Sequence, residues 1–169
     1  PARSISVGLP GGLNYLFDAQ DCYVRFGWFG MFLDVGPNVG RNENDRGGGW
    51  CKILGNKFEL GDSGFPISIG KPDVKQVVKF GGYRRHGKDL PQFYFTIDGN
   101  KVTQTVRPAA QGLGFQYDFE FERDPGVLYY YVSPFGLDLS SSAGKWESGR
   151  LTVPAGQSKK FSVTIARKP

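Results

Sequence analysis

The chain is poor in histidine, cysteine and methionine. Its 169 residues include one histidine, two cysteines and one methionine. A single histidine excludes a multi-histidine metal site formed within the chain. A Ser-His-Asp triad would have to use His86, which lies in a basic, glycine-flanked stretch without a nucleophile motif. We therefore expect His86 to be an exposed turn residue.

Long apolar runs are absent as well. No stretch approaches the ~20 apolar residues that a membrane-spanning helix needs, and no signal peptide, P-loop, dinucleotide fingerprint or haem-attachment motif is visible. Because the chain begins at Pro1 rather than at Met, we expect it to be a processed or excised segment. The net charge of +5 is spread thinly along the chain, so we expect no nucleic-acid partner.

The two cysteines, Cys22 and Cys51, are too few for a disulfide scaffold. Their spacing allows one bridge between them, and it equally allows two buried free thiols. The sequence leaves both alternatives open.

Glycine and aromatic residues are abundant instead. The chain has 25 glycines, and 15% of its residues are aromatic. Residues 115–122 alternate strictly between aromatic and polar side chains. In a strand the aromatic side chains would lie on one face and the polar ones on the other: Phe115, Tyr117, Phe119 and Phe121 on the first, and Gln116, Asp118, Glu120 and Glu122 on the second. This pattern predicts a half-buried antiparallel strand.

The rest of the chain repeats short aromatic and β-branched runs between turn signals such as Asp98-Gly99. The sequence therefore predicts a single all-β domain over residues 1–169, an antiparallel, jelly-roll-like β-sandwich of about a dozen short strands with little or no helix. Trp146 would lie in one short strand, and the other strands are expected at Ser4–Leu9, Leu13–Phe17, Cys22–Trp28, Met31–Val35, Lys52–Leu54, Lys57–Glu59, Pro66–Ile69, Val77–Arg84, Gln92–Ile97, Lys101–Arg107, Phe115–Glu122, Val127–Val132, Leu151–Val153 and Phe161–Ile165.

Three carboxylates share the polar face of the 115–122 strand. Asp118, Glu120 and Glu122 would stand roughly 6.5–7 Å apart along it, a spacing that overlaps the carboxylate pairs of glycosidases and would also suit a hard cation. Cross-strand pairing with cations of the Lys101–Arg107 strand explains the same pattern without catalysis.

A long polar segment, residues 36–49, interrupts the strands. Oxygen-bearing side chains gather in and beside it, and Asp34, Asn42 and Asp45 are candidate ligands for Ca²⁺, although their spacing matches no EF-hand. Calcium is the only cofactor that the sequence suggests.

Aromatic side chains near loops are the candidates for ligand binding. A flat ring stacks on the C–H face of a sugar, and neighbouring polar groups hydrogen-bond its hydroxyls. On this reasoning we expect Trp50, Tyr83 with its neighbour Arg84, and Tyr130 to be the ligand-binding residues. Trp28 and Trp146 are expected in the core.

The turn glycines and aromatic residues also carry a family resemblance. The chain resembles a β-rich accessory domain of large secreted bacterial proteins, which occurs beside c-type cytochrome or quinoprotein sugar-dehydrogenase-like domains. The resemblance rests on Val7–Tyr15, Phe17–Ala19, Cys22, Trp28, Phe32–Asp34, Arg46–Gly49, Leu54-Gly55, Phe80, Gly82–Arg84, Pro91, Phe93-Tyr94 and Ile97–Gly99. It implies a periplasmic or extracellular location near redox or carbohydrate chemistry, and it transfers no catalytic residue.

These observations favour a non-catalytic accessory domain of an exported multidomain protein, which binds a glycan or docks to neighbouring domains. Two alternatives stay open. One is a small glycan-active hydrolase or lyase that uses the carboxylates of the 115–122 strand. The other is a purely structural domain of an assembly.

Overall fold

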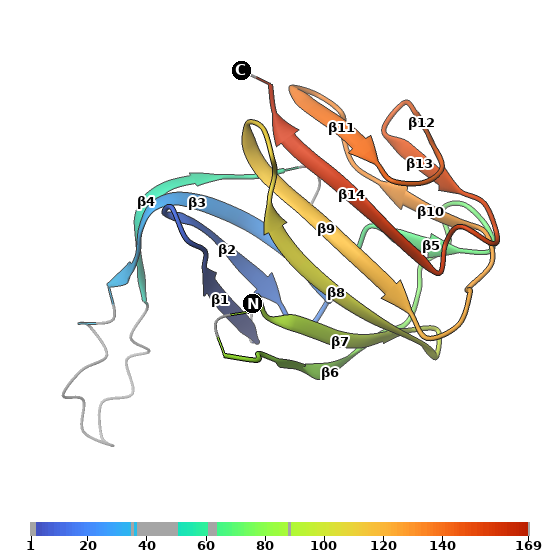
Figure 1. The fold of residues 1–169 in the computed structure, drawn as a ribbon, viewed down its shortest axis with the longest axis horizontal. Helices are drawn as coiled ribbons and strands as arrows, with labels where there is room; N and C mark the ends of the chain where they lie inside the picture. The colour runs from blue at the N-terminus through green and yellow to red at the C-terminus, as the bar shows by residue number, and fades with distance from the viewer. Residues whose placement is uncertain (1–2, 35, 37–50, 61–63, 88, 169) are drawn as a thin grey trace.

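The computed structural model describes residues 3–34, 36, 51–60, 64–87 and 89–168. These residues form 14 strands in three antiparallel sheets and no α-helix, which confirms the all-β fold (Figure 1). Within this part of the chain, no helix has the length and apolar character to cross a membrane.

Sheet A contains the first four strands in chain order. They are β1 (Ser4–Gly8), β2 (Leu13–Asp18), β3 (Tyr23–Asp34) and β4 (Lys52–Phe58). Each strand pairs with the next as a hairpin would, so this sheet is a simple meander.

Sheet B joins strands that are far apart in the sequence. Its order is β12 (Lys145–Glu147), β13 (Arg150–Val153), β10 (Leu128–Tyr131) and β5 (Ile67–Ile69). The pairing of β5 with β10 connects the first half of the chain to the second half.

Sheet C is the largest sheet and has six strands in the order β11-β14-β9-β8-β7-β6. Their bounds are β6 (Val78–Arg84), β7 (Gln92–Ile97), β8 (Asn100–Pro108), β9 (Leu113–Phe121), β11 (Leu137–Ser141) and β14 (Lys160–Arg167). The hairpin between β7 and β8 turns at Asp98 and Gly99, which have φ angles of 47° and 83°. The Asp-Gly signal in the sequence predicted this turn, because it requires positive φ at both residues.

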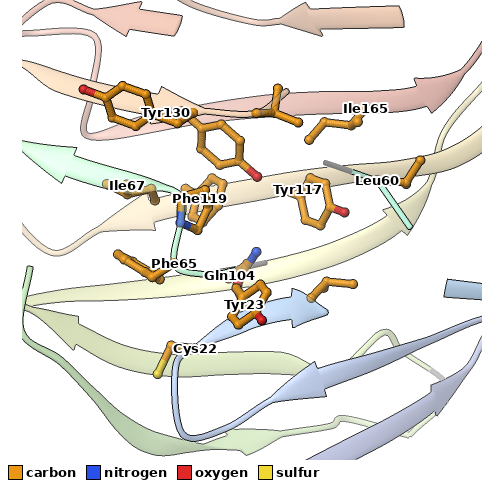
Figure 2. Close-up of a pocket in the computed structure, with 15 residues that line it drawn as sticks. Cys22, Tyr23, Leu60, Phe65, Ile67, Gln104, Tyr117, Phe119, Tyr130 and Ile165 are labelled. Carbon is orange, nitrogen blue, oxygen red and sulfur yellow. The ribbon is translucent and has the colours of Figure 1, made fainter. Parts of the chain in front are cut away.

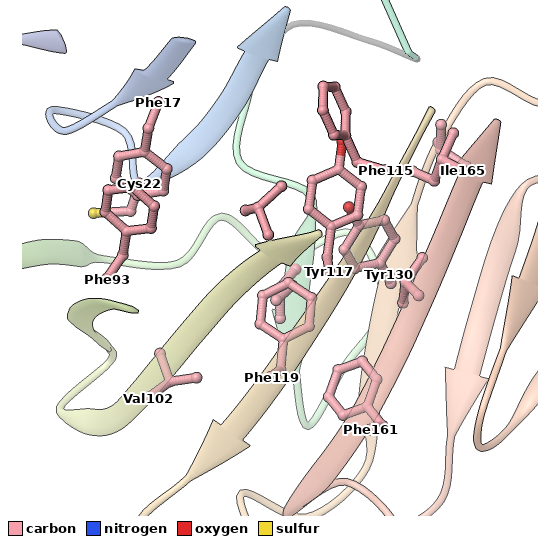
Figure 3. Packing of buried hydrophobic residues seen from close by; sticks show 14 of the residues in the cluster. Phe17, Cys22, Phe93, Val102, Phe115, Tyr117, Phe119, Tyr130, Phe161 and Ile165 are labelled. Carbon is pink, nitrogen blue, oxygen red and sulfur yellow. The ribbon is translucent and has the colours of Figure 1, made fainter. Parts of the chain in front are cut away.

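Sheets A and B cover different parts of the inner face of sheet C. Phe17 of sheet A stacks on Phe93 of sheet C, with ring centroids 3.9 Å apart and planes 8° apart, as Figure 3 shows. Tyr130 of sheet B lies against Phe119 of sheet C, with centroids 6.0 Å apart. The fold is therefore a two-layer sandwich whose second layer is divided between two sheets. In Figure 1, sheet A lies at the left of the view and sheet B at the right.

The alternating segment is β9, near the middle of sheet C. Its aromatic side chains are all buried, as the sequence predicted: Phe115, Tyr117, Phe119 and Phe121. Trp28 is likewise in the core, where its indole N–H donates to the carbonyls of Met31 and Phe32 at 3.1 and 2.9 Å. Trp146 is half-buried and packs against Tyr130.

Apart from shifts of one or two residues at strand ends, the strands differ from the expectation at three places. The predicted break around Gly30 is a bulge within one long strand, β3, where Gly30 has a φ of 131° and lies opposite Gly55. The two short strands expected at 52–59 are likewise one strand, β4. The strand β11 was not predicted, because its serine-rich sequence has little alternation. It forms through pairing with β14.

Candidate ligand-binding face

The face of sheet C that points away from the core is polar. Along β7, β8 and β9 alternate side chains point toward the core and away from it. The outward side chains of these three strands are Gln92, Tyr94 and Thr96 on β7, Lys101, Thr103, Thr105 and Arg107 on β8, and Gln116, Asp118 and Glu120 on β9. We call this surface the outer face.

Two adjoining grooves run across the outer face. The larger has a volume of about 560 Å³ and crosses from β6 to β9, and the second, of about 470 Å³, continues toward β14. Thr103 and Glu120 line both grooves. The volumes fall in the range of small-molecule and oligosaccharide sites, although these grooves are shallower than an enclosed pocket.

Tyr94 is an outward-facing aromatic residue that lines the larger groove, whereas Phe95 and Phe121, which also line it, are buried. It is half-buried, and its hydroxyl donates to the side-chain oxygen of Gln92 at 3.0 Å. The neighbouring strand β6 bulges between Phe80 and Gly82, and its glycines at 81 and 82 place no side chain beside the ring. The guanidinium carbon of Arg84 lies 6.0 Å from the ring centroid, at the outer limit of a cation–π contact. The ring of Tyr94 is thus held in place yet accessible from the groove.

The three carboxylates that the sequence placed on the 115–122 strand are paired with cations. Asp118 accepts a hydrogen bond from Arg107, Glu120 lies 3.1 Å from Lys160, and Glu122 lies 3.5 Å from Lys101. The pairing with the Lys101–Arg107 strand that the sequence suggested is therefore present for Asp118 and Glu122, whereas Glu120 pairs with β14. Such exposed pairs each stabilise the fold by less than about 1 kcal/mol. The carboxylates lie along an open sheet and do not converge on an enclosed cleft.

The predicted ligand-binding residues do not form one site. Tyr83 and Arg84 are consecutive on β6 and point to opposite faces, with the Tyr83 ring, 57% exposed, leaning toward Phe93. Of these two residues, only Arg84 lies near the Tyr94 ring that lines the larger groove. Tyr130 is 4% exposed and belongs to the core rather than to the expected surface platform, because alternation along β10 turns it inward while Tyr129 and Tyr131 turn outward. Trp50 lies outside the described residues.

The sequence analysis missed Tyr94 as a candidate. Its segment, Gln92–Ile97, was recognised as a strand, and alternation alone would have placed Tyr94 opposite Phe93 and Phe95. What the sequence does not signal is that two glycines on the neighbouring strand leave this ring uncovered.

The candidate calcium ligands are only partly described. The carboxylate of Asp34, at the end of β3, accepts a hydrogen bond from the backbone N–H of Gly36 at 2.8 Å. Asn42 and Asp45 lie outside the described residues. Among the residues that the structure describes, no three His, Cys, Asp or Glu side chains gather as a metal site would require.

The two cysteines differ in environment. Cys22 is a buried free thiol in the turn before β3, whereas Cys51 is exposed just before β4. The structure therefore forms no bridge between Cys22 and Cys51, and of the two thiols only that of Cys22 is buried, as the second alternative required. Burial raises the pKa of the Cys22 thiol to about 12, with a smaller contribution from the negative charges of Asp18 and Asp21. This thiol is therefore protonated and unreactive at neutral pH.

A small cavity lies inside the sandwich, where sheets A and B meet over sheet C (Figure 2). Its volume is about 30 Å³, and its lining includes Cys22, Gln104, Tyr117 and Tyr130. Burial raises the pKa of both tyrosines above the ordinary value, so their hydroxyls stay neutral. The cavity is far too small for a sugar. We call it the seam cavity.

His86 is exposed in the turn between β6 and β7, as the sequence predicted. It lies apart from the carboxylates of β9, because strands β7 and β8 separate β6 from β9 in the sheet. This placement supports no catalytic role for the one histidine.

Comparisons of the chain with protein-family models, with curated proteins and with solved structures find no match. The geometry of the outer face therefore carries the functional argument on its own.

Proposed function

We propose that this chain is a non-catalytic binding domain that holds a glycan across the outer face of sheet C. The observation that carries the proposal is the pair of adjoining grooves with the Tyr94 ring at one edge. A glycan chain has both C–H faces and hydroxyls. The Tyr94 ring suits the first, and side chains such as Gln92, Thr103 and Ser162 suit the second.

A binding role fits the outer face better than glycan hydrolysis does. A glycosidase holds two carboxyl groups around one bond, one of them protonated to act as an acid. Here each of the three candidate carboxylates is ion-paired with a cation on a neighbouring strand, and all three lie along an open sheet face. The hydrolase or lyase alternative therefore has less support.

A glycan array with the purified domain tests the proposal. We expect saturable binding to a subset of glycans, and we expect Tyr94→Ala to weaken it by about tenfold, because a stacked ring contributes roughly 1–1.5 kcal/mol. The matched control is Tyr129→Ala. Tyr129 is also half-buried beside an arginine, Arg150, at 6.0 Å, but it lies on sheet B. Equal losses in the two variants, or no binding to any glycan, would contradict the proposal.

Docking to a neighbouring domain is the second candidate function. Phe29, Met31 and Phe32, near the end of β3, expose 51%, 71% and 43% of their surface. Clustered apolar side chains on a surface often mark contacts between proteins. If no glycan on the array binds the domain, docking through these three side chains becomes the favoured function.

We also propose that the domain belongs to an exported protein and works in the periplasm or outside the cell. The support is the resemblance of its turn glycines and aromatics to secreted accessory domains. Fractionation of cells that produce the parent protein tests the location, and recovery of the domain in the cytoplasmic fraction alone would count against it.

A further inference from the structure

Two positive charges near Tyr94 have no carboxylate partner among the described residues, unlike the charges elsewhere on the outer face. Asp118, Glu120 and Glu122 are all paired with cations, namely Arg107, Lys160 and Lys101. Lys79 lines the same groove as Tyr94, and Arg84 lies over the ring from the other end of β6. Neither cation has a carboxylate of the described residues within salt-bridge distance.

The two cations stand on opposite sides of the Tyr94 position, since Lys79 pairs with Thr96 and Arg84 pairs with Gln92. Lys79 and Arg84 are both exposed, and both stand on the edge strand β6, on either side of the two glycines that leave Tyr94 open. Within the part of the chain that the structure describes, the Arg84 guanidinium has no ion-pair partner and lies 6.0 Å from the ring centroid, so it can turn toward an anion at little cost. Asp89, the carboxylate in the turn that follows β6, forms an ion pair with neither cation among the described residues.

We propose that the groove prefers an acidic glycan, one that carries uronate groups, with a sugar ring on Tyr94, its carboxylate at Arg84 and the carboxylate of another uronate at Lys79. This inference rests on the proposed glycan-binding function and adds the class of sugar. An arginine fork binds a carboxylate in two parallel hydrogen bonds, and a lysine supplies a point charge for a second carboxylate along the groove. A neutral sugar would leave both cations without a partner in the complex.

Titration calorimetry with two matched ligands tests the preference. The probes are tetragalacturonate and its fully methyl-esterified form, which have the same sugar and linkage but differ in charge. We expect the acidic form to bind about tenfold more tightly at low salt, because only its carboxylates can contact the two exposed cations. The advantage should shrink as sodium chloride is added, because exposed charges are screened.

A double variant and its control complete the experiment. Lys79→Ala/Arg84→Ala should remove most of the preference for the acidic form while retaining the weaker binding of the ester. Lys145→Ala/Arg150→Ala removes the same two charges from sheet B, also beside a tyrosine, and should leave the preference unchanged. Equal loss in both variants would show attraction to net charge alone and would overturn the inference.

The outcomes separate this inference from the function beneath it. Equal binding of the acid and the ester would overturn the preference for acidic sugars and leave the glycan-binding function in place. Binding of neither ligand, together with an empty glycan array, would overturn both.

A second inference comes from the seam cavity and does not depend on the first. Gln104 faces the core from β8, is 3% exposed and lines the cavity. Its side-chain oxygen has no hydrogen-bond partner among the described residues. Buried polar atoms in proteins are nearly always hydrogen-bonded, because an unpartnered one costs free energy. A cavity of about 30 Å³ has room for one or two water molecules.

We infer that the seam cavity binds ordered water that donates a hydrogen bond to Gln104. Tyr117 and Tyr130 line the same cavity, so their hydroxyls can supply the further partners that a buried water needs. The water would complete the polar contacts at the point where the divided layer leaves space over sheet C.

Crystal structures of the natural protein and of Gln104→Leu test this inference. We expect a water peak within hydrogen-bond distance of the Gln104 oxygen, and we expect that peak to be lost in the variant. A dry cavity in the natural protein, at a resolution that shows other buried waters, would overturn the inference even if the variant failed to fold. A peak that stays unchanged in the variant would overturn it too.

Discussion

Replacing Phe17 with alanine is expected to lower the free energy of unfolding by about 3–5 kcal/mol, the usual cost of truncating a fully buried phenylalanine. The Phe17 ring has no exposed surface and stacks on Phe93 at 3.9 Å between centroids, so it is a principal contact between sheet A and sheet C. Since a domain of this kind is stable by only about 5–15 kcal/mol, the variant should lose a large part of its stability.

Chemical denaturation followed by tryptophan fluorescence measures the effect, since Trp28 lies in the same sheet as Phe17. The control is Phe135→Ala. Phe135 is 94% exposed in the loop between β10 and β11, and its loss should change stability by less than about 0.5 kcal/mol. A cost below about 1 kcal/mol for Phe17→Ala would mean that sheet A does not pack on sheet C as described.

The second large effect is expected from Gly114→Ala. Gly114 pairs with Ala166 where the beginning of β9 meets the end of β14. A Cβ atom built there would lie 2.1 Å from the carbonyl oxygen of Ile165 and 2.4 Å from the Cα of Ala166. Both are backbone atoms, so the clash cannot be relieved by turning a side chain. We expect a loss of about 3 kcal/mol, at the upper end of the usual cost of overpacking.

Hydrogen exchange and denaturation together test this prediction, because separation of β14 from β9 should speed amide exchange along both strands. The comparison is Gly81→Ala, at which a Cβ atom would have its nearest neighbour at 3.2 Å, the carbonyl oxygen of Tyr94. This change should cost about 1 kcal/mol or less. Similar stability losses for Gly81→Ala and Gly114→Ala would contradict the close approach of β9 and β14.

The sequence by itself determined the fold class and the direction in which most strand residues point. Alternation along β9 places four aromatic rings in the core, and the Asp98-Gly99 pair sets the hairpin between β7 and β8. Both are local properties, because they depend on the geometry of a single strand or turn. The pairing of Glu122 with Lys101 followed from the same alternation once the two strands were neighbours.

The tertiary structure alone decided which surface is a candidate site. The sequence treats Tyr94 and Tyr130 alike, as tyrosines within strands. Packing of sheet B on sheet C buries Tyr130, whereas a bulge and two glycines on β6 leave Tyr94 at the edge of a groove. Strand order, the division of one layer into two sheets and the seam cavity are likewise set by contacts between segments far apart in the chain. Alternation within a strand carries no information about its neighbours, so only the assembled sandwich could settle them.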